Sequence, residues 1–333
     1  MRRLPGNLKA GMAVVALVLL VGAAAPLLAP YDPAEQLDPV AARYRPPGTV
    51  LTAVHLSDGT WRLADRVERV PEGLAIERLG RREVLPESRW TSIDRRVFLL
   101  GTDRFGRDLW SRMVHGARVS LSVGLLAVAL ALTLGVAVGS AAALGGPLVD
   151  SVLMRLVDAL LAFPWIFLMI LLSSLFQPDT LALILLMGSF NWMGISRLTR
   201  AEILGLERRE FVVAARSIGQ TPLKVLFRHL LPNALTPVLV RATLTIGTLI
   251  LLESSLSFLG MGIQPPTPTW GNMVAEGRDA MGQAWWIVTF PGAALAVTVI
   301  AFNLLGDGLR DLLDPRHDVK ERTERPAAML PPA

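Results

Sequence analysis

Six long apolar runs limit what this chain can fold into. Runs of about 18 or more apolar residues are typical of membrane-spanning helices, because lipid offers the backbone no hydrogen-bond partners. The composition agrees, since 52% of the 333 residues are hydrophobic and only 18% are charged. The sequence therefore predicts an all-α polytopic membrane protein with six transmembrane helices. These helices are expected at roughly 10–30, 119–144, 152–176, 180–199, 235–260 and 284–306.

The basic residues indicate how the chain is oriented in the membrane. Three of them precede the first run, whereas the loops after the third and fifth runs hold only Arg278. Short loops rich in Lys and Arg stay in the cytoplasm, so both termini and the 200–232 loop are expected there. The net charge of +5 then reflects orientation, and no nucleic-acid partner is expected. Seven basic residues lie in or beside that loop: Arg197, Arg200, Arg208, Arg209, Arg216, Lys224 and Arg228.

The chain divides into four parts. The small residues after the first run also fit a cleaved signal peptide, but the length of the run favours a retained anchor. We therefore assign 1–35 to an N-terminal tail and first helix, 36–115 to an extracytoplasmic segment, 116–311 to a core of five helices, and 312–333 to a charged, Pro-rich tail expected to be disordered.

The extracytoplasmic segment contains two patterns typical of β-hairpins. TAVHLSDGTWRLA alternates apolar and polar residues around Asp58-Gly59, and GLAIERLGRREVL repeats the pattern more weakly. We predict a small β-rich insert at about 48–95, with an irregular loop as the alternative.

Motifs for energy conversion and catalysis are missing from the sequence. The phosphate-binding loop G-x-x-x-x-G-K-[ST] needs a Lys after Gly, and none of Lys9, Lys224 and Lys320 follows one. The chain has no H-E-x-x-H motif and no Cys, and its four His are scattered. We expect neither a catalytic nor a metal site.

A few polar residues fall within the apolar runs, where they usually face a bundle interior or a water-filled path. Glu253 has two interpretations. It is either a gate or contact for a substrate amine, or an interhelical hydrogen-bonding group together with nearby serines. The candidates for a translocation path or gate are Asp158, Asn191, Glu253, Ser254, Ser257 and Asn303.

The loop between the fourth and fifth runs has the pattern of a helical hairpin. EFVVAARSIGQTPLKVLFRHLLPNA predicts a helix over 198–218, a stop at Gly219, and a second helix that begins at Thr221-Pro222 and is broken by Pro232. The second helix has an expected apolar face, made of Leu223, Leu226, Phe227 and Leu230.

This hairpin is suited to docking another protein. Ala214 and Ala215 are small enough to permit close approach, and charged residues surround them as a polar rim. A helix lying in the membrane interface is the alternative, but its apolar face would be richer in Trp, Phe and Leu than VVAARSIG. The expected docking set is Arg208, Arg209, Glu210, Ala214, Ala215, Arg216, Gly219, Thr221 and Pro222.

At these residues the sequence resembles the permease subunits of bacterial ATP-binding-cassette (ABC) importers. Their cytoplasmic signature is Glu-Ala-Ala, three residues, Gly, nine residues, Ile, one residue, Leu-Pro. Val213 and His229 replace its Glu and Ile, and AARSIG with RHLLPN is closer to the dipeptide/oligopeptide/nickel branch. The positions in register are Ala214, Ala215, Gly219, Leu231 and Pro232.

Two further stretches are similar to the C-type permeases of that branch. They are LLGTDRFGRDLWSRMVHGARVSL at 99–121, which enters the second span, and WWIVTFPGAALAVTVIAFNLLGDGLRDLLDPR at 285–316, which forms the last span and its exit. The insert departs from the usual short form of its loop, so the resemblance implies nothing about it.

The resemblance implies a type I ABC importer permease fold and a non-catalytic subunit. Such a subunit forms half of a path for di- or oligopeptides, or in the alternative for nickel or another small solute. Its expected partners are a homologous second permease, two ABC ATPases, an extracytoplasmic solute-binding protein and membrane lipid. ATP and Mg are bound by those ATPases, so no cofactor is expected in this chain. The resemblance places it in the bacterial inner membrane as a multi-pass protein.

In such permeases the Ala-Ala/Gly loop is the coupling helix, seated in a cleft of the ATPase. Two other classes of function remain open at this point. One is a membrane sensor or scaffold that recruits a cytoplasmic partner without transport, and the other is an autonomous secondary transporter.

The GTDRFGRD motif also has two interpretations. It is either an entry turn, capped by Thr102 or Asp103 and held by Arg–Asp pairs, or a surface that contacts the second permease or the binding protein. For the insert we expect contact with the binding protein. The residues of the motif are Gly101, Thr102, Asp103, Gly106, Arg107, Asp108 and Arg112.

Overall fold

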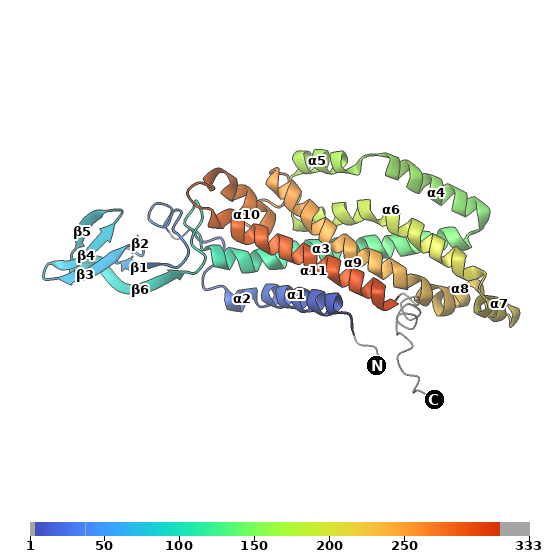
Figure 1. The fold of residues 1–333 in the computed structure, drawn as a ribbon. Coiled ribbons are helices and arrows are strands. Elements are labelled where there is room, and N and C mark those ends of the chain that lie inside the picture. Colours follow the sequence, from blue (N-terminus) through green and yellow to red (C-terminus); the bar gives the residue numbers. More distant parts are fainter. Residues whose placement is uncertain (1–3, 37, 314–333) are drawn as a thin grey trace, which may run out of the picture.

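A bundle of long helices carries the β-rich insert at one end (Figure 1). The computed structural model describes residues 4–36 and 38–313, so all but the first two residues of the expected C-terminal tail lie outside the described part. The helices are α1 Gly6–Ala23, α2 Ala25–Leu28, α3 Leu109–Leu144, α4 Gly146–Ala162, α5 Trp165–Phe176, α6 Thr180–Glu207, α7 Glu210–Ser217, α8 Pro222–Val225, α9 Leu231–Phe258, α10 Trp270–Gly277 and α11 Trp286–Leu313.

The helix bounds confirm five of the predicted spans and correct the sixth. Within the described residues, five helices are long and apolar enough to cross a membrane, while the run at 152–176 is divided between α4 and α5, which are bent by 70°. The bend falls at Phe163 and Pro164, where Phe163 is extended with ψ 130°. Proline disfavours a helical conformation in the residue before it, which accounts for the break. Six spans result if the bent pair counts as one.

Helix α3 lies at the centre of the packing. One apolar cluster joins it to α1, α10 and α11, and a second joins it to α5, α6 and α9. Gly139 of α3 lets α6 approach closely, because a Cβ there would lie 2.5 Å from the carbonyl oxygen of Ser196. Small residues of this kind are what permit close helix packing in membranes.

The two ends of the bundle carry different structures. The β-rich insert lies at one end, which we call the insert end (Figure 1). Helices α7 and α8 lie at the opposite end, here the loop end, and the start of α1 and the end of α11 point toward it.

The insert consists of two three-stranded antiparallel sheets, ordered β2-β1-β6 and β3-β4-β5. Both predicted hairpins are present: His55 pairs with Trp61 across the Asp58-Gly59 turn, and Arg78 pairs with Arg81. The strands extend slightly beyond the predicted range of 48–95. They are β1 Thr49–Leu56, β2 Trp61–Ala64, β3 Arg66–Val70, β4 Gly73–Arg78, β5 Arg81–Leu85 and β6 Trp90–Phe98, with a short 3₁₀ turn (η1) at Glu87–Arg89.

The buried carboxylate of Asp38 connects the insert to the segment that leaves the membrane. It accepts hydrogen bonds from the backbone N–H groups of Val40 and Ala41, at 3.1 and 2.9 Å, and pairs with Arg78 at 2.8 Å. Leu63 of β2 donates a longer bond of 3.4 Å to the same carboxylate. One side chain thus contacts both sheets.

The loop between α6 and α9 differs from its predicted form in two ways. The first helix is interrupted at Arg208 and Arg209, which divide α6 from α7. The expected break at Pro232 is wrong, because a π-helical turn (η2, Leu226–Leu230) leads α8 directly into α9. Since a π-turn shifts the hydrogen-bonding register, the helix continues past a proline that lacks an N–H group.

Candidate functional site: the helical hairpin, its groove and the intramembrane polar groups

The turn after α7 is a Schellman motif built around Gly219. Gly219 has φ +79°, a left-handed conformation that favours glycine. Its N–H group donates to the carbonyl of Arg216 at 2.9 Å, and the N–H group of Gln220 donates to Ala215 at 3.2 Å. These two bonds are those of the motif, so α7 ends in a defined geometry. Thr221 occupies the N-cap position of α8, but its side chain makes no capping bond.

Helix α7 is held firmly to the rest of the chain. Val212 and Ala215 are buried and pack in one cluster with Ile203 of α6, Val225 of α8 and Leu230 of η2. The predicted role for two adjacent small residues is thereby divided: Ala215 faces the chain's own core, and Ala214 faces outward. Burial of these apolar side chains couples the position of α7 to α6 and α9.

The outward face of α7 carries an apolar stripe. Phe211, Ala214 and Ile218 are exposed and recur at i, i+3 and i+7, which places them on one side of the helix. Ile218 is 76% exposed. We call these three residues the loop stripe. The loop stripe is an apolar surface that no described part of the chain covers.

Charged residues surround the loop stripe as the sequence predicted. Arg208, Arg209 and Glu210 are exposed at the start of α7, and Arg216 pairs with Glu207 of α6. The surface therefore combines an apolar centre with a polar rim.

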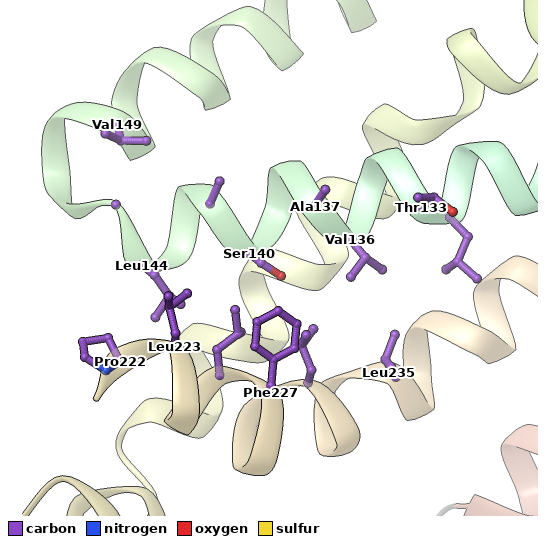
Figure 2. Close-up of a pocket in the computed structure, with 15 residues that line it drawn as sticks. Thr133, Val136, Ala137, Ser140, Leu144, Val149, Pro222, Leu223, Phe227 and Leu235 are labelled. Atoms are coloured by element: carbon purple, nitrogen blue, oxygen red, sulfur yellow. The ribbon is translucent and has the colours of Figure 1, made fainter. Parts of the chain in front are cut away.

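The predicted apolar face of the second helix is split between two environments. Leu226 and Leu230 are buried, whereas Leu223 and Phe227 are 66% and 67% exposed. The exposed pair lines an apolar groove of about 860 Å³ between α3, the start of α4, and the α8–α9 segment. Figure 2 shows Leu223 and Phe227 from one side of this groove opposite Ser140 and Leu144 from α3.

The GTDRFGRD motif forms a buried ionic cluster at the insert end. Arg107 pairs with Asp103 at 2.6 Å and with Glu276 of α10 at 2.6 Å. Arg112 of α3 pairs with Glu276 at 3.1 Å and lies 3.6 Å from Asp103. None of the four side chains is more than 8% exposed. We call them the ionic clasp, because they join the motif to α10.

The N-cap of α3 is Asp108 rather than Thr102 or Asp103. The Asp108 carboxylate accepts hydrogen bonds from the N–H group of Ser111 at 2.8 Å and from its hydroxyl at 2.6 Å. Asp103 instead caps the preceding turn, where it accepts from the N–H group of Phe105 at 2.8 Å. Thr102 pairs with backbone groups of the segment before the insert. Gly101 and Gly106 both have positive φ in this turn.

Glu253 lies in the interior of the subunit. Its side chain is fully buried and accepts a hydrogen bond from the Ser257 hydroxyl at 2.8 Å and a longer one from Ser254 at 3.4 Å. Gly271 of α10 lies against Ser254, where an added Cβ would be 2.5 Å from the Ser254 Cα. The carboxyl group therefore lies where α9 packs on α10.

The other candidate path residues are dispersed. Asp158 of α4 pairs with Arg197 of α6. Asp150 of α4 pairs with Arg200, which lies about one turn after Arg197 on α6. Asn191 donates to the carbonyl of Met187 at 2.8 Å. Asn303 is exposed on α11. The structure thus brings together Glu253, Ser254 and Ser257 but not the remaining three.

Sequence reasoning missed several residues at these sites. Phe211 and Ile218 were visible as apolar residues at helical spacing from Ala214, and that spacing is the signal that identifies the loop stripe. Glu276 carried no such signal, because it lies 164 residues from Arg112.

The chain is similar to known membrane subunits of transport systems. A family model described as the binding-protein-dependent transport system inner membrane component matches residues 131–319. The chain is 40% identical over 227 residues to the di/tripeptide transport system permease protein DppC of Pseudomonas aeruginosa, a match covering 68% of this chain and 75% of that protein. It is 42% identical over 216 residues to the dipeptide transport system permease protein DppC of Alkalihalophilus pseudofirmus, covering 65% of this chain and 71% of that protein.

A solved structure shares the fold. The inward-facing MetNI methionine ABC transporter aligns with a TM-score of 0.50 at 20% identity, over 61% of this chain and 96% of that chain. The region matched by the family model extends from the middle of α3 to beyond the end of α11 and includes the helical hairpin. The chain therefore belongs to the family of binding-protein-dependent transport system inner membrane components, as a permease subunit of an ABC importer.

Proposed function

We propose that this chain forms half of the translocation path of a peptide importer and transmits the ATP cycle of a cytoplasmic ATPase through its 210–232 loop. The observation that carries the coupling role is the loop stripe, an exposed apolar surface on a helix that is packed firmly against α6 and α9. The names of the two DppC relatives support di- or tripeptides as the cargo class. Membership of a transport-system family favours this function over a sensor or scaffold.

The proposed orientation puts the loop end in the cytoplasm and the insert end outside. The basic residues of the 200–232 loop support it, and so does the direction of α1 and α11, because the start of α1 and the end of α11 both point toward the loop end. The proposed partners are a homologous second permease, two ATPases that bind ATP and Mg, and a solute-binding protein. The insert then projects toward the binding protein and provides a contact for it.

Rigid coupling follows from the packing of α7. ATP binding draws the two ATPases together, and the loop stripe moves with the one that holds it. Because Val212 and Ala215 pack against α6 and α8, that movement tilts the spanning helices and switches the path between inward- and outward-open states. Coupling is reciprocal in binding free energy, so the loaded binding protein also shifts the state of the ATPases.

Two substitutions at Gly219 test this role in the complete complex, reconstituted in proteoliposomes. Gly219→Val places a β-branched residue at φ +79°, which alters the turn and misdirects the loop stripe. We expect it to lower both peptide uptake and substrate-stimulated ATP hydrolysis by about tenfold or more, equivalent to about 1.4 kcal/mol of lost coupling.

Gly219→Asn is the matched control, because Asn adopts the left-handed conformation readily and no atom lies within 4 Å of the added Cβ. It should retain most of both activities. Normal uptake and stimulated hydrolysis in the Val variant would contradict the coupling role, whatever the cargo proves to be.

A further inference from the structure

An arginine without an ion pair among the described residues lies within the apolar helix α9. Arg241 is on α9, about 15 Å along the helix axis from Leu231 and about 25 Å from Phe258. Its side chain is exposed. In the part of the chain that the structure describes, Arg197 and Arg200 of α6 pair with carboxylates of α4, whereas no carboxylate pairs with Arg241.

The position of Arg241 restricts what its face of α9 can contact. Arg241 lies about a quarter of the way along the span expected at 235–260, and an arginine inside a membrane-spanning helix is costly, by about 2.5–3.5 kcal/mol at the helix centre on insertion scales. Such residues almost always face a bundle interior or a water-filled path. Since Arg241 is exposed on this subunit, its side of α9 is turned away from lipid.

Arg241 lines two cavities. The first, of about 450 Å³, lies between α6, α9 and the end of α11, and its polar lining residues are Glu202, Thr236, Arg241 and Arg310. The second, of about 210 Å³, lies between α5, α6 and α9, and more than half of its lining residues are polar or aromatic. The lining residues of that kind are Trp165, Phe190, Asn191, Arg241, Thr245 and Thr248.

The side chains around Arg241 offer hydrogen-bond acceptors, while Arg241 offers only donors. The Thr245 hydroxyl donates to the carbonyl of Arg241 at 2.9 Å, and Thr248 donates to Leu244 at 3.4 Å. The Asn191 amide nitrogen donates to Met187 at 2.8 Å. These donors are used within their own helices, so the oxygens of the three side chains remain available as acceptors. A guanidinium has five N–H donors and no acceptor, and its geometry matches a carboxylate.

We propose that Arg241 is a substrate contact in the translocation path, where its guanidinium binds the C-terminal carboxylate of the passing peptide. The inference rests on the proposed peptide cargo. Asn191, Thr245 and Thr248 accept hydrogen bonds from the peptide's backbone N–H groups or its terminal ammonium. Arg241, Thr245 and Thr248 therefore identify the face of α9 that lines the path, and Asn191 of α6 lies beside that face.

The test compares two forms of one tripeptide, the free acid and its C-terminal amide. Initial uptake is measured in proteoliposomes that contain the full complex with wild-type chain, Arg241→Gln or Arg241→Lys. We expect Arg241→Gln to lower uptake of the acid by about tenfold, the effect of losing one charge-assisted hydrogen bond. Uptake of the amide should stay within about twofold of wild type, and Arg241→Lys should retain most uptake of the acid.

The solute-binding protein is the same in every sample, so its own preference for a free carboxylate cancels in the ratio of variant to wild type. Arg155→Gln is the matched control. Arg155 is exposed on α4, does not line either cavity beside Arg241, and has no ion pair among the described residues. Complexes with Arg155→Gln should take up both peptides at the wild-type rate.

Four results would overturn the inference. Equal loss of acid and amide uptake would mean a structural role, and unchanged uptake of both would mean no contact. Loss of the second permease from the purified Arg241→Gln complex would mean that Arg241 pairs across a subunit interface. A wild-type complex that carries neither peptide, yet hydrolyses ATP, would instead contradict the proposed cargo and the inference with it.

Discussion

The two ends of this bundle differ in whether their functional side chains are buried or exposed. At the insert end, the ionic clasp buries two arginines and two carboxylates, and each charge has its partner within the chain. At the loop end, the loop stripe leaves Phe211 and Ile218 exposed although both are apolar. The ionic clasp is complete within one subunit, whereas no part of the described chain covers the loop stripe.

This difference has a physical consequence for mutation. Removing one member of a buried charged group leaves the others unpaired in a poor solvent, so the folded subunit loses stability. Changing an exposed apolar residue has little effect on folding but alters what can bind there. Substitutions at the insert end should therefore lower the stability of the subunit, whereas substitutions at the loop end should weaken its assembly with partners.

The largest effect is expected at the clasp. Glu276→Gln leaves Arg107 and Arg112 with only Asp103 as a carboxylate partner, and should lower the free energy of unfolding by about 3 kcal/mol. Thermal unfolding of the purified subunit in detergent, followed by gel filtration, measures this change.

Asp279→Asn is the control for the clasp, because the nearby Arg278–Asp279 pair is exposed. Exposed pairs contribute only about 0–1 kcal/mol. Equal Tm shifts for the two variants would show that burial does not distinguish the clasp.

A smaller effect, of a different kind, is expected at the loop stripe. Ile218→Asp places a charge in the apolar centre of the proposed ATPase contact and should weaken co-purification of the ATPase by about tenfold, or about 1.4 kcal/mol. The Tm of the subunit alone should stay the same. Leu79→Asp is the control, since Leu79 is 51% exposed on the β4–β5 turn at the insert end. If both variants kept the ATPase, the loop stripe would not be the contact.

The smallest effect is a pH dependence within the insert. Burial by itself raises the pKa of Asp38, but hydrogen bonds from the Ala41 N–H group and Arg78 hold it below the ordinary value of 3.8. Because the folded pKa is lowered, the stabilisation is present above pH 3.8 and is lost as pH falls through the folded value. Limited proteolysis of the insert should therefore accelerate in that acidic window.

Asp38→Asn separates this titration from general acid effects. It should destabilise the insert by about 1 kcal/mol at neutral pH, because Arg78 loses its charged partner. It should also remove the part of the acid sensitivity that comes from Asp38. Identical acid profiles for the variant and wild type would exclude Asp38 as the titrating group.

Sequence patterns succeeded where a structure depends on neighbouring residues. The hairpin around Asp58-Gly59 and the turn at Gly219 are present as predicted, because each depends on the backbone preferences of a few adjacent residues. The predicted break at Pro232 was wrong for the opposite reason: proline removes one hydrogen bond, but a π-turn five residues long accommodates it.

By itself, the sequence determined that the chain spans a membrane, which loops carry the basic charge, and where the helical hairpin turns. Hydropathy and local backbone preference decide those features. Only the tertiary structure decided that Ala215 faces inward and Ala214 outward, that Glu276 completes the clasp, and that Arg241 remains without a carboxylate in the described chain. Such pairings depend on how helices pack across long sequence separations, and no local pattern encodes that packing.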